Sequence, residues 1–188
     1  MFDLALGQNS ELPVRWVPHD QGFGSTFSRP EESLFRIRTD NVTPVLPPPL
    51  PALTRDIKAI DLSNAAPKLL QLTQNAEGTP FSLGINGVPG DKAAPVMATM
   101  GETQIWTVQN TIQFAHPFHL QGFFFQVLDV NGVAPALREW RDTVDVPVDA
   151  TVRLAMTFDE RPGMWMFHCH ILDHSDAGMM GMVHLLSH

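Results

Sequence analysis

The chain has 188 residues, enough for one ordinary domain and a remnant of another, since domains typically contain roughly 100 to 150 residues. Hydrophobic residues make up 44% of it, so it can bury a core and does not have the composition of a disordered chain. With 12 basic against 20 acidic residues and no Lys/Arg cluster, it lacks the positive patch that nucleic-acid binding needs, and no apolar stretch reaches the roughly 20 residues that cross a bilayer. We therefore expect a soluble globular protein with neither a nucleic-acid partner nor a membrane span.

The first part of the chain has too few strands for a core of its own. MFDLALGQNS has neither the basic start nor the long apolar stretch of a signal peptide, so none is expected in this chain. LPVRW and SLFRIRT are predicted as two strands separated by turns and loop, and the repeated prolines of VTPVLPPPLPAL favour an extended linker. We interpret residues 1–54 as the tail of a preceding domain plus a proline-rich linker, with an independent amino-terminal hairpin as the alternative.

From residue 55 onward, short apolar runs alternate regularly with turn residues. Strands are predicted in eight segments: KLLQLTQN, PFSLGING, TQIWTVQN, FFFQVLDV, TVDVPV, TVRLAMTF, MWMFHCHI and GMVHLLS. In TVRLAMTF, every second residue from Val152 to Phe158 lies on one face, which we expect to be buried, while Ala155 and its alternates lie on the other. Many short strands and few helices predict an all-β fold, a sandwich or barrel, for residues 55–188.

Five of the eight histidines fall in two short segments, HPFHLQG and HCHILDH, and the second contains the single cysteine. One cysteine excludes an internal disulfide, so any role of Cys169 must come from its thiol chemistry. Because successive side chains of a strand point to opposite faces, Cys169 faces one side and both His168 and His170 face the other. One strand can therefore serve two separate metal sites.

On the cysteine side, the chain can turn after Ile171 and bring His174 and Met179 back to the same point, and His116 can supply a fourth ligand. Two imidazoles, one thiolate and a weak thioether form the ligand set of copper used for electron transfer. Zinc also accepts histidine and cysteine, but it gives Met179 no role as a ligand. The backbone of Cys169 continues directly into both neighbouring histidines, which offers an electron a short bonded route between the two sites.

The other histidines and methionines are interpreted as ordinary structural residues. His19, His184 and His188 are assigned as packed or solvated side chains. The remaining carboxyl-terminal methionines are taken as core or pocket lining in preference to a methionine-rich copper relay: Met164, Met166, Met180 and Met182.

HPFHLQG followed by GMWMFHCHILDHSDAGMM resembles the carboxyl-terminal cupredoxin domain of a laccase-type multicopper oxidase, and GETQIWTVQN and RDTVDVP fit the same pattern. The resemblance covers residues 55–188 and implies a Greek-key cupredoxin fold with copper as the cofactor. It implies a type 1 copper held by His116, Cys169, His174 and Met179, a type 2 copper on His119, and paired type 3 coppers on His168 and His170. Dioxygen is reduced to water at the type 2 and type 3 coppers of that family.

The sequence departs from the family pattern at three points. The first motif of the family ends in a third histidine, where this chain has Gln121, and a carboxamide is a poor copper ligand, so one type 3 copper should be weakened or lost. Ser175 stands where bacterial relatives often carry a proton-delivering glutamate, with Asp176 one residue along. The HxH motifs that an amino-terminal cupredoxin domain contributes to the trinuclear centre are absent from this chain.

The leading hypothesis is a copper-dependent oxidoreductase domain in which Cys169 passes electrons from a small reducing substrate to His168 and His170. Other cupredoxin domains of the same oxidase, or a homo-oligomer, would complete the oxygen-reducing centre. The alternatives are a blue-copper electron-transfer or copper-binding module without oxidase activity, which Gln121 and Ser175 favour, and a structural domain that has lost copper. The resemblance implies a periplasmic or secreted protein, and phenols, aromatic amines, cuprous and ferrous ions remain open as reductants.

Overall fold

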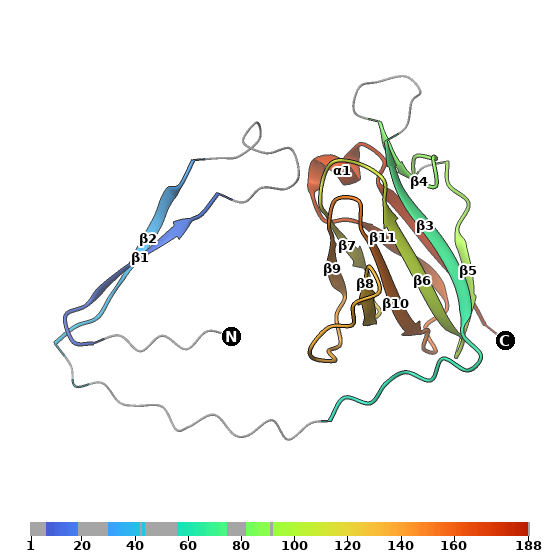
Figure 1. The fold of residues 1–188 in the computed structure, drawn as a ribbon, viewed down its shortest axis with the longest axis horizontal. Coiled ribbons are helices and arrows are strands. Elements are labelled where there is room, and N and C mark those ends of the chain that lie inside the picture. Colours follow the sequence, from blue (N-terminus) through green and yellow to red (C-terminus); the bar gives the residue numbers. More distant parts are fainter. Residues whose placement is uncertain are drawn as a thin grey trace. The chain divides into compact units, whose positions relative to one another are not determined.

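The computed structural model describes residues 7–18, 30–41, 43, 56–74, 82–90 and 92–187. The chain divides into two units, Met1–Asp56 and Ile57–His188 (Figure 1). The predicted linker VTPVLPPPLPAL lies almost wholly outside the described residues.

The first unit contains an antiparallel pair of strands, β1 (Glu11–Trp16) and β2 (Glu32–Arg38), which confirms the two strands predicted there. Exposed ion pairs join the strands, with Glu11 contacting Arg36 and Arg38, and such pairs contribute little to stability. Apolar side chains of β2, including Phe35, are exposed. A two-stranded ribbon of this kind is at best marginally stable in water by itself.

The second unit consists of two five-stranded sheets (Figure 1). The first sheet has the strand order β4 (Leu83–Ile85), β3 (Ala66–Gln74), β6 (Thr103–Asn110), β10 (Thr151–Thr157) and β8 (Gln126–Val130). The second has the order β5 (Val96–Thr99), β12 (Met180–Leu186), β11 (Gly163–Cys169), β7 (His116–Leu120) and β9 (Thr143–Val146). The pairs β3–β6 and β5–β12 are parallel and the other pairs are antiparallel. The predicted all-β sandwich is confirmed.

Aromatic side chains fill the space between the sheets. Trp106 of β6 is fully buried and meets Phe118 of β7 and Phe167 of β11 edge-on, with ring centroids 6.2 and 5.1 Å away. Its indole N–H donates to the Oε1 atom of Gln104 at 2.8 Å, so the polar end of the ring is satisfied inside the core. Strands β7 and β11, which carry the metal-ligand candidates, are thus held against the first sheet.

The predicted alternation in β10 is confirmed, since the side chains from Val152 to Phe158 on the expected face are all buried. Ala155 on the opposite face is buried as well. Its ladder partner Gln126 hydrogen-bonds the backbone of Lys58 and Ile60, so the segment before β3 covers this part of the outer face. Strand alternation alone does not reveal such a covering segment.

All eight strands predicted after residue 55 are present, but the prediction missed two strands and a helix. The four-residue strand β5 and the strand β7, within the HPFHL motif, carry weak strand signals. The single-turn helix α1 (Leu172–Asp176) follows β11 and lies at one end of the sandwich (Figure 1). None of the helices in the described part has the length and apolar character needed to cross a membrane.

Gly178 links α1 to β12, and we predict that it does not tolerate a side chain. Its φ is +109°, and a Cβ atom there would lie 2.5 Å from the carbonyl oxygen of Leu83. Gly178→Ala should therefore lower the free energy of unfolding by roughly 2 to 4 kcal/mol, through backbone strain and overpacking together. Gly132→Ala is the matched control, because Gly132 has a φ of +81° but open space around it. Equal losses for the two variants in denaturant titrations would contradict the packing argument.

Candidate metal centre

Strands β7 and β11 and helix α1 bring three of the four predicted type 1 ligands together. His116 begins β7 and Cys169 ends β11, and these strands are neighbours in the second sheet with both side chains facing its buried side. After Ile171 the chain turns into α1, where the backbone N–H groups of His174 and Ser175 both donate to the carbonyl oxygen of Ile171 at 3.0 Å. This turn carries His174 back toward the end of β11.

The donor atoms of these three residues form a small triangle. The Sγ atom of Cys169 lies 3.5 Å from Nδ1 of His116 and 3.7 Å from Nδ1 of His174. The two Nδ1 atoms lie 3.1 Å apart. Donors that share one ion at about 2.0 to 2.3 Å are separated by about 3 to 4 Å when the angles at the ion are near tetrahedral. The spacing and the His₂Cys donor set therefore fit a single soft transition-metal ion.

The backbone of Met179 is hydrogen-bonded to two residues of this triangle. Its carbonyl oxygen accepts the N–H of Cys169 at 3.0 Å, and its own N–H donates to the carbonyl oxygen of His174 at 3.0 Å. Its side chain is fully buried in the same apolar cluster as Cys169. The part of Met179 as a weak fourth ligand stays a prediction.

Burial sets the protonation of the three donors. Burial and the neighbouring His174 lower the pKa of His116 to about 3, and burial likewise lowers the pKa of His174. Burial raises the pKa of the Cys169 thiol to about 11. At neutral pH both imidazoles are therefore neutral and ready to bind a cation, while the thiol must lose its proton to do so.

His119, His168 and His170 lie together on the opposite, outer face of the same sheet. Their ring centroids are separated by 5.3 Å from His119 to each of the others and by 5.5 Å between His168 and His170. The prediction that β11 aims its thiol and the adjacent imidazoles at opposite faces therefore agrees with the arrangement of the side chains. Among the described residues, His116, Cys169 and His174 are the group whose ligand atoms all lie within 4.8 Å of one another, so the donor atoms of the outer histidines are less closely gathered.

Two of the outer histidines, His119 and His168, are oriented by backbone carbonyls. Nδ1 of His168 lies 2.8 Å from the carbonyl oxygen of Cys169, and Nδ1 of His119 lies 3.0 Å from that of Asp142 and 2.9 Å from Oγ1 of Thr143. A carbonyl only accepts, so Nδ1 carries the proton in both rings and Nε2 keeps the free lone pair. His119 and His168 therefore offer Nε2 as a ligand atom, whereas the buried triangle offers Nδ1.

The departures from the family pattern also lie around these sites. Gln121 follows β7, is exposed, and shares the outer side with His119 by strand alternation. Ser175 and Asp176 belong to α1, Ser175 half-buried and Asp176 exposed.

Sequence reasoning missed Asn110, a buried residue that fixes the segment leading into His116. Its Nδ2 group donates to the carbonyl oxygens of Phe114, Val146 and Pro147, and its Oδ1 accepts the N–H of Ile112. The ring of Phe114 meets His174 edge-on, with centroids 5.1 Å apart. The sequence does contain a sign of this role. Asn110 lies on the buried face of the strand TQIWTVQN, where a polar side chain must find hydrogen-bond partners.

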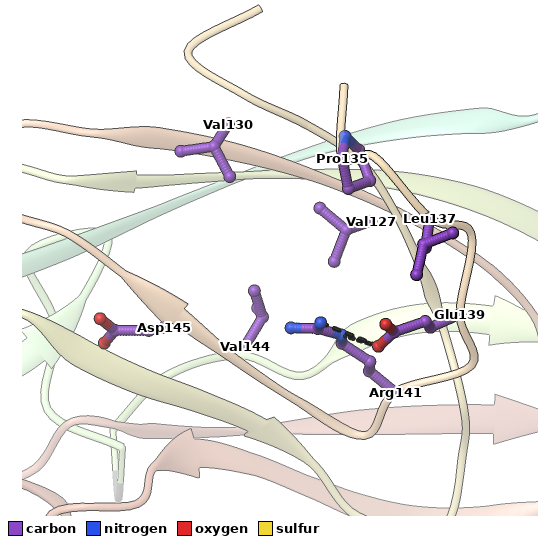
Figure 2. Close-up of a pocket in the computed structure, with 8 residues that line it drawn as sticks. All are labelled: Val127, Val130, Pro135, Leu137, Glu139, Arg141, Val144 and Asp145. Atoms are coloured by element: carbon purple, nitrogen blue, oxygen red, sulfur yellow. Dashed lines mark hydrogen bonds and ion pairs between the residues drawn. The ribbon is translucent and has the colours of Figure 1, made fainter. Parts of the chain in front are cut away.

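A pocket of about 200 Å³ lies elsewhere, at the edge formed by β8, β9 and the segment between them. Figure 2 shows its apolar side chains, such as Val127 and Leu137, around the ion pair of Arg141 and Glu139. None of its eight lining residues is a metal-ligand candidate, so it is distinct from both groups of donors.

Comparison with known proteins gives consistent matches. The family model described as multicopper oxidase matches residues 61–186. A laccase of Haloferax volcanii is 37% identical over 107 residues, covering 51% of this chain and 18% of the laccase, and a laccase of Bacillus subtilis is 33% identical over 130 residues, covering 57% and 25%. The crystal structure of the McoA multicopper oxidase from Aquifex aeolicus superposes with a TM-score of 0.76 at 24% identity, covering 95% of this chain and 41% of that one. The resemblance expected from the sequence is confirmed, and the chain spans less than half the length of these proteins.

We predict that copper binding releases one proton from Cys169. A pH near 7 lies above the lowered pKa values of both imidazoles and below the thiol pKa of about 11. Copper binding therefore displaces only the thiol proton. Copper affinity should rise about tenfold per pH unit and level off above the thiol pKa. Proton release on copper addition, measured together with the intense blue absorption of a copper–thiolate bond, checks this. Cys169→Ser should lose both signals, and a serine variant that stayed blue would refute the assignment.

We also predict that Asn110→Asp changes the geometry of the metal centre, although Asn110 is not one of its ligands. A carboxylate in place of the amide loses the donors and faces three carbonyl oxygens, which should destabilise the fold by roughly 2 to 4 kcal/mol. The absorption and electron spin resonance of bound copper should change because Phe114 and His116 lose their support. Asn131→Asp, at an exposed turn, serves as the control. Unchanged copper spectra in folded Asn110→Asp protein would exclude a positioning role.

Proposed function

This chain belongs to the multicopper oxidase family, and from that premise we propose that it acts as the electron-accepting domain of a copper-dependent oxidoreductase. In this proposal the type 1 copper is held by His116, Cys169, His174 and Met179, the type 2 copper by His119, and the type 3 coppers by His168 and His170. Bound copper supplies one-electron oxidation and reduction, which these side chains alone do not provide. A small reducing substrate donates the electrons and dioxygen is their final acceptor.

The observation that carries this proposal is the position of Cys169 between the two groups of donors. Its sulfur belongs to the buried triangle, while its backbone is bonded directly to His168 and His170. Its carbonyl oxygen also accepts the Nδ1–H of His168 at 2.8 Å. The chain thus offers an electron a covalent route from the sulfur to both outer rings and a hydrogen-bonded route to one of them.

The two groups of donors differ in their exposure, which suits different tasks. Cys169 is 1% exposed and His116 is 0% exposed, so water is excluded from the sulfur and from one imidazole. His119 and His168 are half-buried and His170 is exposed on the outer face. This difference is compatible with electron entry at the buried Cys169 site and reaction with dioxygen at the more exposed histidines of the outer face.

We propose that the outer site is completed by other cupredoxin domains of the same oxidase or by a homo-oligomer. Three histidines and Gln121 are too few imidazoles for a trinuclear copper centre. Residues 1–54 are proposed to be the tail of a preceding domain with its linker, and residues 55–188 the cupredoxin domain. The marginal two-stranded sheet β1–β2 and the superposition over 95% of the chain support that division. A periplasmic or secreted location is part of the same proposal.

The test is the number of copper atoms per chain in size-separated fractions of the purified protein. We expect a monomer to bind one type 1 copper, turn blue, and consume no oxygen with a phenolic or metal-ion reductant. Higher copper content and oxygen consumption are expected only in an assembly that supplies further histidines. A monomer that consumes oxygen at rates typical of laccases would refute the need for a partner.

Gln121→His provides a matched variant for the outer site. In an assembled protein it should raise the type 3 copper content and the rate of oxygen consumption, because it restores an imidazole on the same side of the sheet as His119. If the variant gained neither, even with a partner domain present, the chain would be an electron-transfer or copper-binding module without oxidase activity.

A further inference from the structure

A row of soft donor side chains crosses the outer face of the second sheet, away from both groups discussed above. Strands β5, β12 and β11 are neighbours, and their register places Met97 opposite His184 and His184 opposite Met164. Side chains of directly paired residues point to the same face and have Cβ atoms about 5 Å apart. Two thioethers therefore flank one imidazole on three adjacent strands.

These side chains are accessible in the described part of the chain. Met97 is 43% exposed and Met164 is 51% exposed, while His184 is half-buried between them. The alternate residues of the same strands, Ala98 and Val183 among them, are buried in the sandwich core. The row therefore faces outward on a rigid support, which fixes the spacing of its donors.

The chemistry of the row is selective. Strands β5, β11 and β12 contain no Asp, Glu, Lys or Arg. The carboxylate of Glu102, which contacts β5 at Thr99, already accepts hydrogen bonds from Thr99 and Gln104. Thioether sulfur with imidazole suits cuprous ion, a soft cation that accepts three ligands, far better than it suits zinc or magnesium. A second pair of methionines, Met166 and Met182, occupies the next row on the same face.

The row is separate from the proposed copper sites. Met164 lies four residues before His168 on β11, a distance of about 13 Å along a strand. Cys169 points to the opposite, buried side of the same strand. An ion held by the row would therefore share no ligand with either site.

We propose that Met97, His184 and Met164 form a binding site for one cuprous ion on the outer face of the second sheet. The expectation from the sequence that Met164 lies in the core or lines a pocket is wrong, because its side chain is 51% exposed. Met97 is brought beside His184 by β5, a strand that the sequence pattern does not predict. The proposal does not depend on oxidase activity and needs no redox step.

The experiment is anaerobic competition for cuprous ion between the protein and a chromophoric chelator. The native chain should hold one cuprous ion more than the doubly substituted Met97→Leu/Met164→Leu chain, or hold it about tenfold or more tightly. Leucine keeps the volume and apolar character of methionine but removes the sulfur. Both chains should show the same blue absorption after loading with cupric ion, since the type 1 ligands are untouched.

Met100→Leu is the matched control, because Met100 packs against the core in a turn and lies outside the row. Repeating the competition in Cys169→Ser protein separates this proposal from the type 1 assignment, because the row should still bind there. X-ray absorption of the extra cuprous ion should show two sulfur neighbours and one nitrogen neighbour. Equal cuprous binding by the native and doubly substituted chains, or an equal loss in Met100→Leu, would overturn the proposal.

Discussion

The pleat of β11 is the constraint on which the rest of the molecule depends. Adjacent residues of an extended strand cannot face the same way, so Cys169 and His168 must serve different sides of the sheet. The carbonyl oxygen of Cys169 then also fixes the ring of His168 through its Nδ1–H group, which leaves Nε2 as the free donor. Covalent geometry and one hydrogen bond therefore decide both where each donor points and which of its atoms is available.

The buried triangle requires support from residues that do not belong to it. Neutral imidazoles and a protonated thiol, as their shifted pKa values require at neutral pH, have no mutual charge attraction to hold them 3 to 4 Å apart. The spacing is imposed by the backbone, through the pairing of β7 with β11, the α1 turn and the side chain of Asn110. The spacing of the three donor atoms is therefore set by the fold around them, and these supporting residues decide where the donors of a bound ion lie.

The sequence predicted the parts of the fold that depend on local pattern. The buried face of β10 and the two-sided geometry around Cys169 follow from a period of two, which needs no knowledge of neighbours. Strand β5, and the segment that covers Ala155, depend on contacts between segments far apart in the chain. Local periodicity carries no information about such contacts. Strand β7 was missed because His116 and Pro117 are unusual strand residues, although the motif itself had been recognised as a source of ligands.

The outer face of the second sheet carries two kinds of chemistry at different positions along the same strands. Where β7 pairs with β11, the outward side chains include the imidazoles, and where β12 pairs with β11 and with β5, they are mostly thioethers. Imidazole binds both oxidation states of copper, whereas thioether favours the cuprous state. Gln121 follows β7 at the imidazole group, and we expect its carboxamide to bind copper more weakly than the histidine of the family pattern. If the proposed assignments hold, Gln121 lowers the copper affinity of the imidazole group and leaves the thioether row unchanged, so the face as a whole should prefer cuprous ion without any change in the fold that supports it.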